Sequence, residues 1–186
     1  MTAALGSVDV LVNNAGLYLM HAPLASGYDA WCDRWRETLA TNLEGPAHLS
    51  LLAAPVMSAR PAALDTAFGR GRIVNISSRG AFRGEPGAPG YAASEAGLNA
   101  LGQSLARALA PRQIYVYGIA PGWVETDMAV AHLAGPDGEE IRAQHPLGRL
   151  NSAAEVADAA VYCALDAPAA MTGGITDVNG ASYLRT

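Results

Sequence analysis

The stretch RIVNISSRGAFRGEPGAPGYAASEAGLNALGQSLARALAPRQIYVYGIAPG, residues 72–122, contains two apolar runs separated by a helical pattern. Residues 72–76 and 114–119 are rich in β-branched side chains and continuous rather than alternating in polarity, which is typical of strands covered on both faces. Between them, leucines recur at spacings of three and four residues and predict a helix over 91–110 that Pro111 ends. A strand, a helix and a strand in this order predict a parallel sheet.

Similar patterns on both sides extend this unit into a single α/β domain over 1–186. Further strands are expected over 8–12 and 174–178, and further helices over 28–57, in two pieces, and 153–165. Ser152 is a suitable N-cap for the last helix. Segment 58–71 reads as a long connection, and segment 126–146 as a mobile excursion over a strand end, the usual position of a lid.

Polar and small residues follow three of the predicted strands. The sequences are NNAG at 13–16, NISS at 75–78 and PGWVET at 121–126. In open parallel sheets, ligands bind beyond the carboxyl ends of the strands, where small residues let the backbone approach a cofactor. A Ser or Asn side chain at such a position can orient a carbonyl group. Each motif alone is also typical of an ordinary loop after a strand, so only their combination indicates a site.

The combination resembles the short-chain dehydrogenase/reductase family, and within it the 3-oxoacyl-carrier-protein reductases. The motifs occur in this order: NNAG, Asn42 in TNLEG, NISS ending at Ser78, Tyr91 thirteen residues later, and PGWVETDM. The likeness covers residues 8–180, nearly the whole chain. It implies a Rossmann-like, doubly wound parallel sheet, and the interconversion of a ketone and a secondary alcohol with NAD or NADP.

The resemblance also assigns roles to single residues. Tyr91 would exchange a proton with the substrate oxygen, Ser78 would hold that oxygen by a hydrogen bond, and Asn42 would anchor a water in the proton relay. The residues expected to bind the cofactor are Asn14, Ala15, Gly16, Tyr91, Pro121, Gly122, Val124 and Thr126. Trp123 and segment 129–145 would line an apolar substrate pocket. The plainer alternatives are a helix-starting Tyr, a strand-end Ser and a helix-face Asn.

One position departs from the family pattern of Tyr, three residues and Lys. The run here is YAASE, so Glu95 stands one helical turn after Tyr91. In the family, that lysine lowers the tyrosine pKa and binds the ribose hydroxyls. A charge about 5 Å away at an effective dielectric near 20 contributes roughly 3 kcal/mol, so reversing its sign raises the tyrosine pKa by about four units. Glu95 is protonated in an apolar site, binds the ribose hydroxyls, or turns to solvent; impaired catalysis is expected.

The second departure lies ahead of residue 13, where the family's glycine-rich TGxxxGxG motif is expected and does not occur. We therefore expect the chain to be the carboxyl-terminal part of the fold, lacking its first three strand-helix units, roughly 75 residues. The strand at 8–12 would be the fourth in the order 3-2-1-4-5-6-7 and would have an exposed edge. Weak binding of NAD or NADP is expected, and the preference between them cannot be read.

Composition excludes several other classes of protein. The net charge is −5 and the 12 Lys and Arg are scattered, which argues against a nucleic-acid partner. Cys32 and Cys163 show no paired spacing, and the four histidines are dispersed, so a reducing cytoplasmic location and no metal are expected. No apolar run reaches the roughly 18 residues of a membrane span.

Two functional hypotheses remain at this point. The first is an NAD(P)-dependent oxidoreductase acting on a small-molecule carbonyl or alcohol substrate, with activity impaired by Glu95 and by the absent glycine-rich motif. The alternative is a non-catalytic, truncated family member that acts through protein association. In either case the helices at 42–57 and 91–110 are expected to form a homo-oligomer.

Overall fold

The computed structural model describes residues 6–61, 68–135 and 138–185 and contains one sheet of parallel strands. The strands are β1 (Val10–Asn13), β2 (Gly71–Ile76), β3 (Ile114–Pro121) and β4 (Ile175–Val178), and they lie side by side in sequence order. The register aligns Asn13 with Asn75, and Asn75 with Gly118. The predicted strands and the Rossmann-like α/β class are confirmed, with strand ends shifted by one or two residues.

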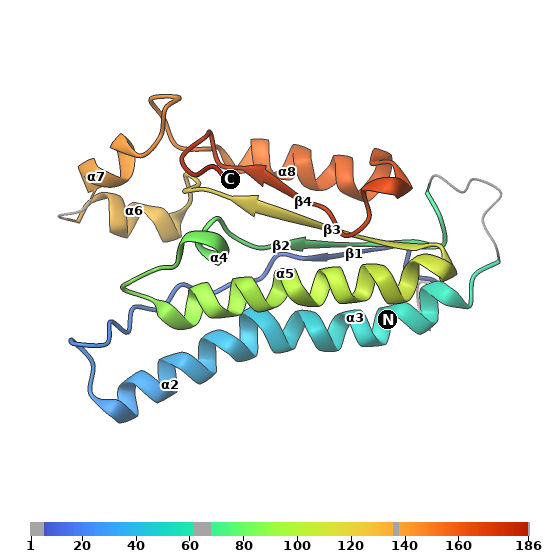
Figure 1. Ribbon diagram of the computed structural model, residues 1–186, viewed down its shortest axis with the longest axis horizontal. Coiled ribbons are helices and arrows are strands. Elements are labelled where there is room, and N and C mark those ends of the chain that lie inside the picture. Colours follow the sequence, from blue (N-terminus) through green and yellow to red (C-terminus); the bar gives the residue numbers. More distant parts are fainter. Residues whose placement is uncertain (1–5, 62–67, 136–137, 186) are drawn as a thin grey trace.

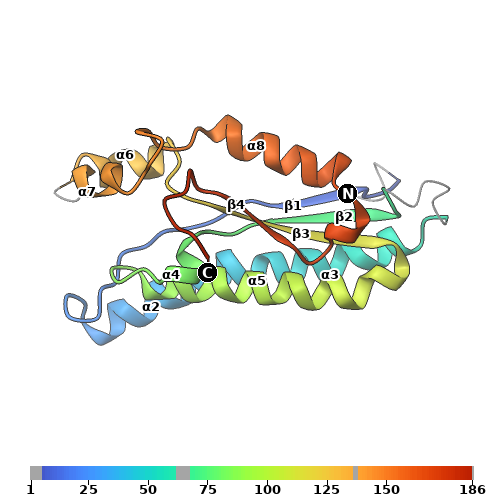
Figure 2. The same ribbon diagram turned by 45° about the horizontal axis from the view of Figure 1, so that its top comes forward.

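Helices cover both faces of the sheet. Figures 1 and 2 show α3 (Gly45–Ser58) and α5 (Pro89–Leu109) on one face and α8 (Ala153–Val161) on the other. Helix α2 (Tyr28–Leu39) precedes α3 and also contacts α5. This arrangement makes β2 and β3 central, which is why their sequences are continuously apolar.

Alternate side chains of the central strands feed two apolar clusters. Ile73 and Val116 pack against α3 and α5, where Ala53, Met57 and Ala106 meet them. Their neighbours Val74 and Tyr117 point to the opposite face and pack against the segment after α8, with Cys163, Ala164 and Ala167. Burying each large apolar side chain contributes about 1.5–3 kcal/mol to folding, so both faces hold the sheet in place.

The helix predicted in two pieces over 28–57 is interrupted by a π-helical turn rather than by a loop. That turn covers Ala40–Glu44 and contains the buried Asn42. The segment after α8 is also π-helical, over Tyr162–Asp166. Helix α5 passes into a 3₁₀ turn at Ala110–Arg112, where Pro111 ends the α-helix as expected. Ser152 is the N-cap of α8, as predicted.

The segment expected as an irregular excursion over 126–146 contains two short helices. They are α6 (Asp127–Leu133) and α7 (Gly138–Ala143), and with α4 (Gly80–Arg83) they gather at the end of the sheet toward which the strands point (Figure 1). The sequence did not predict these helices, because each is too short to show a periodic pattern and the glycines Gly135 and Gly138 are typical of loops. Of the predicted connection 58–71, residues 62–67 lie outside the described part.

The outer edge of β1 has no neighbouring strand among the described residues. β1 pairs with β2 on one side, and the side chain of Val12 is 44% exposed. The exposed edge that the sequence predicted is therefore present in the described sheet. None of the described helices combines the length and the apolar character that crossing a bilayer requires.

Candidate active site

The residues predicted to form a site come together at the carboxyl edge of the sheet. Asn14, Ala15 and Gly16 leave β1 and are exposed. Ser78 follows β2, and Gly122 begins the loop after β3. Because parallel strands end at one edge, three segments distant in sequence border the same space. The first turn of α5, with Tyr91, starts beside them.

Tyr91 and Ser78 form a pair of hydroxyl groups. Ser78 Oγ accepts a hydrogen bond from the Gly80 backbone N–H at 3.0 Å, and the Ser78 side chain acts on the Tyr91 phenol. Burial raises the pKa of Tyr91, the carboxylate charge of Glu95 adds to this effect, and the Ser78 hydroxyl opposes it. The phenol therefore holds its proton near neutral pH.

Asn42 ties three segments together from its π-helical turn. Its side-chain oxygen accepts a hydrogen bond from the Leu17 N–H at 2.8 Å, and its Nδ2 donates to the Leu17 carbonyl at 3.0 Å. The same Nδ2 lies 3.1 Å from Ser94 Oγ and 3.3 Å from Glu95 Oε1. Asn42 thereby fixes the loop after NNAG against α5. The water-anchoring role expected of Asn42 stays a prediction.

Glu95 is buried and neutral rather than turned to solvent. The residue is 3% exposed, and burial raises its pKa to about 8. Its Oε1 accepts from Asn42, while Oε2 is buried without a hydrogen-bond partner among the described residues. The burial of Glu95 excludes the solvent-facing alternative, and its raised pKa favours the protonated form near neutral pH. Binding of the ribose hydroxyls by Glu95 stays a prediction.

The sequence analysis missed the residue that caps the start of α5. His21 Nε2 accepts a hydrogen bond from the Gly90 N–H at 2.9 Å, and its Nδ1 lies 2.7 Å from the Leu19 carbonyl. This geometry assigns the proton to Nδ1, since Nε2 must be the acceptor. The ring is 1% exposed and packs edge-on against Trp31 and Trp35. His21 thus holds the turn that carries Tyr91. No motif or periodic pattern in the sequence marks this loop residue as a helix cap.

An aromatic cluster extends from the Tyr91 ring. Tyr18 meets it edge-on, with ring centroids 4.8 Å apart, and His132 meets Tyr18 at 5.2 Å. Trp123 lies 6.0 Å from Tyr18 and 5.5 Å from His132. Trp123 and His132 of α6 thus join Tyr91 through Tyr18, a residue that the sequence did not predict. The substrate-lining role expected of Trp123 stays a prediction.

A second carboxyl group, Glu85, lies close to the hydroxyl pair. A Cβ placed on Gly80 would be 3.0 Å from Glu85 Oε1 and 3.3 Å from Ser78 Oγ, so a side chain there would crowd both. Glu85 Oε2 accepts from the Tyr18 hydroxyl at 3.4 Å. Burial raises the pKa of Glu85, and burial together with Glu85 raises the pKa of Tyr18 to about 12.

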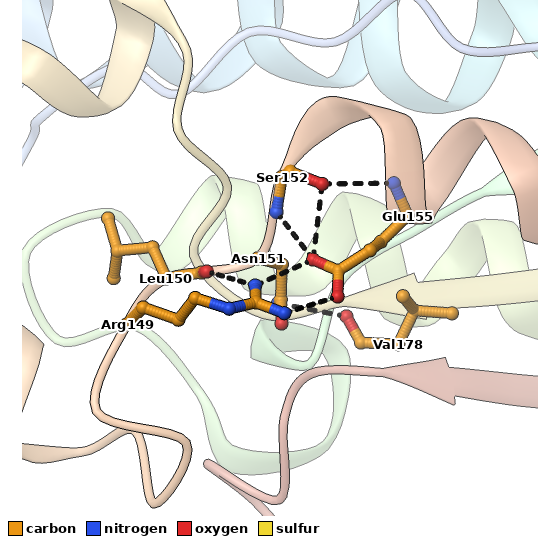
Figure 3. A network of polar contacts seen from close by, with 6 residues as sticks. All are labelled: Arg149, Leu150, Asn151, Ser152, Glu155 and Val178. Carbon is orange, nitrogen blue, oxygen red and sulfur yellow. Dashed lines mark hydrogen bonds and ion pairs between the residues drawn. The ribbon is translucent and has the colours of Figure 1, made fainter.

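The loop after β3 is fixed by the segment before α8. Val124 and Asn151 form a β-bridge, and Asn151 Nδ2 donates to the Val178 carbonyl at 3.0 Å (Figure 3). A Cβ on Gly122 would lie 3.0 Å from Ser182 Oγ and 3.1 Å from Asn151 Nδ2, so glycine is needed there. Val124 and the exposed Thr126 are consequently held at the edge beside Tyr91.

These residues fit the nicotinamide and ribose half of a dinucleotide. Small exposed residues at 14–16 and the loop at 122–126 lie at the same edge of the sheet as Tyr91, and Glu95 Oε2, one turn along α5, has no hydrogen-bond partner among the described residues. The side chains of Asp127, Met128 and Ala131 lie outside the described part. Among the described residues no three His, Cys, Asp or Glu side chains gather as metal ligands would.

Known proteins resemble this chain over almost its whole length. Residues 1–181 match the family described as enoyl-(acyl carrier protein) reductase. The 3-oxoacyl-[acyl-carrier-protein] reductase FabG of Escherichia coli (strain K12) is 37% identical over 182 residues, which is 98% of this chain and 69% of that protein. FabG of Aquifex aeolicus is 35% identical, covering 95% of this chain and 66% of that protein. Acetoacetyl-CoA reductase of Rhizobium meliloti is 36% identical, covering 97% and 70%.

Proposed function

The chain belongs to the short-chain dehydrogenase/reductase family of NAD- or NADP-dependent oxidoreductases, and we propose that it interconverts a ketone and a secondary alcohol, with activity reduced by Glu95. The observation that carries this proposal is the placement of Tyr91, in the first turn of α5, and Ser78, just after β2, at the carboxyl edge of the sheet. Two hydroxyl groups at one point suit a carbonyl oxygen that gains a proton. A carbon–carbon double bond offers no such oxygen at the reacting atoms.

Each residue then has a task around the substrate oxygen. A nicotinamide cofactor would supply the hydride, and residues 14–16 and 121–126 would hold it. Ser78 would donate a hydrogen bond to the carbonyl oxygen, which polarises the bond. Tyr91 would deliver its proton to that oxygen as the alcohol forms. Asn42 keeps the cofactor-side loop and α5 in register, because it binds both.

Glu95 accounts for the reduced activity. A protonated carboxyl group carries no charge, so nothing at position 95 lowers the pKa of Tyr91, and burial keeps that pKa high. When pH rises and Glu95 ionises, its negative charge raises the Tyr91 pKa further. A tyrosine that releases its proton with difficulty is a poor proton shuttle near neutral pH.

The substrate we propose is a small ketone or β-ketoacyl compound. Tyr18 contacts the Tyr91 ring, and Trp123 and His132 pack against Tyr18, so the surroundings of Tyr91 suit a partly apolar molecule. The relatives are named for 3-oxoacyl and acetoacetyl substrates, which agrees with a ketone near an acyl chain. A cytoplasmic location, the absence of a metal and the absence of a nucleic-acid partner stay predictions.

A non-catalytic role in association is the second candidate, and α3 favours it. Leu51 and Leu52 are each 69% exposed and Leu49 is 51% exposed, so an outer face of α3 presents apolar surface to solvent. We propose that α3 and α5 form the interface of a homo-oligomer, as the sequence predicted for 42–57 and 91–110. An assembly of this kind is compatible with either function.

The proposed reaction is tested by titration and turnover. Calorimetric titration with NADH and NADPH measures whether either cofactor binds, and NADPH oxidation with ethyl acetoacetate measures turnover. We expect slow turnover that Tyr91→Phe and Ser78→Ala abolish and that Tyr162→Phe, at the exposed end of α8, leaves unchanged. No binding of either cofactor, or turnover that survives Tyr91→Phe, would overturn the proposal and favour association.

A further inference from the structure

Two arginines beside the candidate active site share one neutral oxygen. Arg79 Nη2 donates to Gln144 Oε1 at 2.7 Å, and Arg83 Nη1 donates to the same atom at 3.0 Å. Arg79 follows Ser78 directly, and Gln144 comes from the segment after α7. Two cations that converge on a single oxygen are the donor arrangement that suits a carboxylate.

Arg79 lacks the counter-charge that a buried cation normally has. The residue is 2% exposed, and no ion pair among the described residues involves it. Its side chain also donates a hydrogen bond to the Ser182 carbonyl, at 3.4 Å. Burial and the like charge of Arg83 together lower the pKa of Arg79 to about 10, against the opposing charge of Glu85. Burying a charge without an ion-pair partner costs folding free energy, so the presence of such a residue favours a functional role for it.

His145 supplies an independent observation at the same place. It is 3% exposed, and both ring nitrogens are buried without a partner among the described residues. Burial lowers its pKa, and the charge of Arg79 lowers it as well. His145 directly follows Gln144, whose side-chain oxygen binds the Arg79 guanidinium. A neutral imidazole still has one N–H to donate, so a third donor is available.

The arginines connect to Tyr91 through a continuous chain of contacts. Tyr18 packs on the Tyr91 ring, and its hydroxyl binds Glu85. Arg83 Nε lies 3.9 Å from Glu85 Oε1. Glu85 neutralises one of the two cations and leaves a net positive charge. A substrate whose anionic group binds the two arginines would therefore place its reacting carbon next to Tyr91.

We propose that Arg79 and Arg83, with His145, form a subsite for a carboxylate group of the substrate, and that Gln144 Oε1 occupies the place of a carboxylate oxygen. This inference rests on the proposed function and narrows its substrate to a keto acid or hydroxy acid. The half-buried Gln144 can leave toward solvent when the acid enters. The bidentate fit of guanidinium to carboxylate supplies the selectivity over a neutral ester.

Calorimetric titration with acetoacetate and with ethyl acetoacetate, with and without NADPH, tests the subsite. Arg83→Gln is the variant, since its side chain is partly exposed, and Arg112→Gln at the far end of α5 is the matched control. We expect Arg83→Gln to weaken acetoacetate binding by about 10- to 100-fold, with the ester unaffected and Arg112→Gln silent. Gln144→Ala should tighten acetoacetate binding, because it removes the competing oxygen.

Equal affinity of the wild-type chain for acid and ester, absence of acetoacetate binding, or equal weakening of both by Arg83→Gln would overturn the subsite. In that case Gln144 serves only to tie the segment after α7 to α4. The two proposals fail separately. Acetoacetate binding that depends on Arg83 without turnover contradicts the reaction, whereas turnover of the ester with no preference for the acid contradicts the subsite.

Discussion

The chemistry of this chain depends on Glu95, one helical turn after Tyr91. Its burial, its contact with Asn42 and its raised pKa make it a neutral group at physiological pH. Near neutral pH, Glu95 therefore does not place a negative charge where the family has the positive charge of a lysine. What the site lacks there is a positive charge that would ease release of the Tyr91 proton.

Glu95→Lys is expected to increase ketone reduction. A positive charge about 5 Å from the tyrosine oxygen lowers its pKa by about two units at an effective dielectric near 20. Steady-state NADPH oxidation near neutral pH should therefore rise by about tenfold or more. Glu95→Gln is the control, because it keeps the shape and adds no charge. An equal rise in both variants would show that the carboxyl group, and not the missing charge, limits the rate.

Glu95 also predicts how stability depends on pH. Its pKa rises from an ordinary value of 4.5 to about 8 on folding, so the folded chain keeps a proton that the unfolded chain loses between these values. The stabilisation is complete below pH 4.5 and is lost as pH rises to about 8, by up to about 1.4 kcal/mol per pH unit.

Urea denaturation of the wild-type chain and of Glu95→Gln, at about pH 5 and about pH 9, measures this contribution. The amide of the variant does not titrate, so the wild type should lose a few kcal/mol relative to it at the higher pH. Parallel stability profiles of the two proteins would contradict the assigned burial of Glu95.

At the scale of elements, the starts of helices α5 and α8 are held in two different ways. His21, in the loop after β1, accepts from Gly90 at the start of α5 and positions Tyr91. The start of α8 is held locally instead. Ser152 Oγ accepts from the Glu155 N–H at 3.2 Å, and Glu155 Oε2 accepts from the Ser152 N–H at 2.8 Å (Figure 3). Arg149 pairs with Glu155 and helps to lower the pKa of that carboxyl to about 2.

Ser152→Ala is expected to lower the free energy of unfolding by about 1 kcal/mol, because the Glu155 N–H loses its acceptor. Urea denaturation near neutral pH measures the change. Ser104→Ala is the matched control, since Ser104 lies inside α5, is exposed and bonds only the Ala100 carbonyl among the described residues. That variant should change stability by a few tenths of a kcal/mol at most. Equal losses in both would contradict the capping assignment.

At the scale of the whole molecule, the open surfaces of the sheet and of α3 favour association. The chain covers 69% of the length of the Escherichia coli relative, and β1 is an edge strand in the described sheet. Helix α3, which carries the exposed leucines, lies on the same face of the sheet as α5 (Figure 2). Two separate surfaces can therefore contact other chains.

Leu52→Glu is expected to shift the chain toward a smaller species in sedimentation velocity, because a charge at the proposed α3 interface opposes burial. Leu24→Glu is the control, since Leu24 is fully exposed in the loop before α2. Glu95→Lys should leave the sedimentation profile unchanged, because position 95 is buried within the subunit. A wild-type chain that sediments as a monomer at every concentration would contradict the interface.

The sequence by itself determined the strands and helices of the parallel sheet, because a sequence displays local periodicity directly. Tyr91, Ser78 and Asn42 were assigned to the site through the resemblance of ordered motifs to the family, and their roles stay predictions. Periodicity could not show the π-helical turn at Asn42, nor the short helices α6 and α7, because each lasts too few residues.

Only the tertiary structure decided the ionisation of Glu95, the cap that His21 gives to α5, and the meeting of Arg79 with Gln144. The last pair is separated by 65 positions, and the His21–Gly90 bond by 69. A pKa depends on how far distant segments exclude water, and a hydrogen bond depends on which of them come within about 3 Å. Neither quantity exists until the chain has folded.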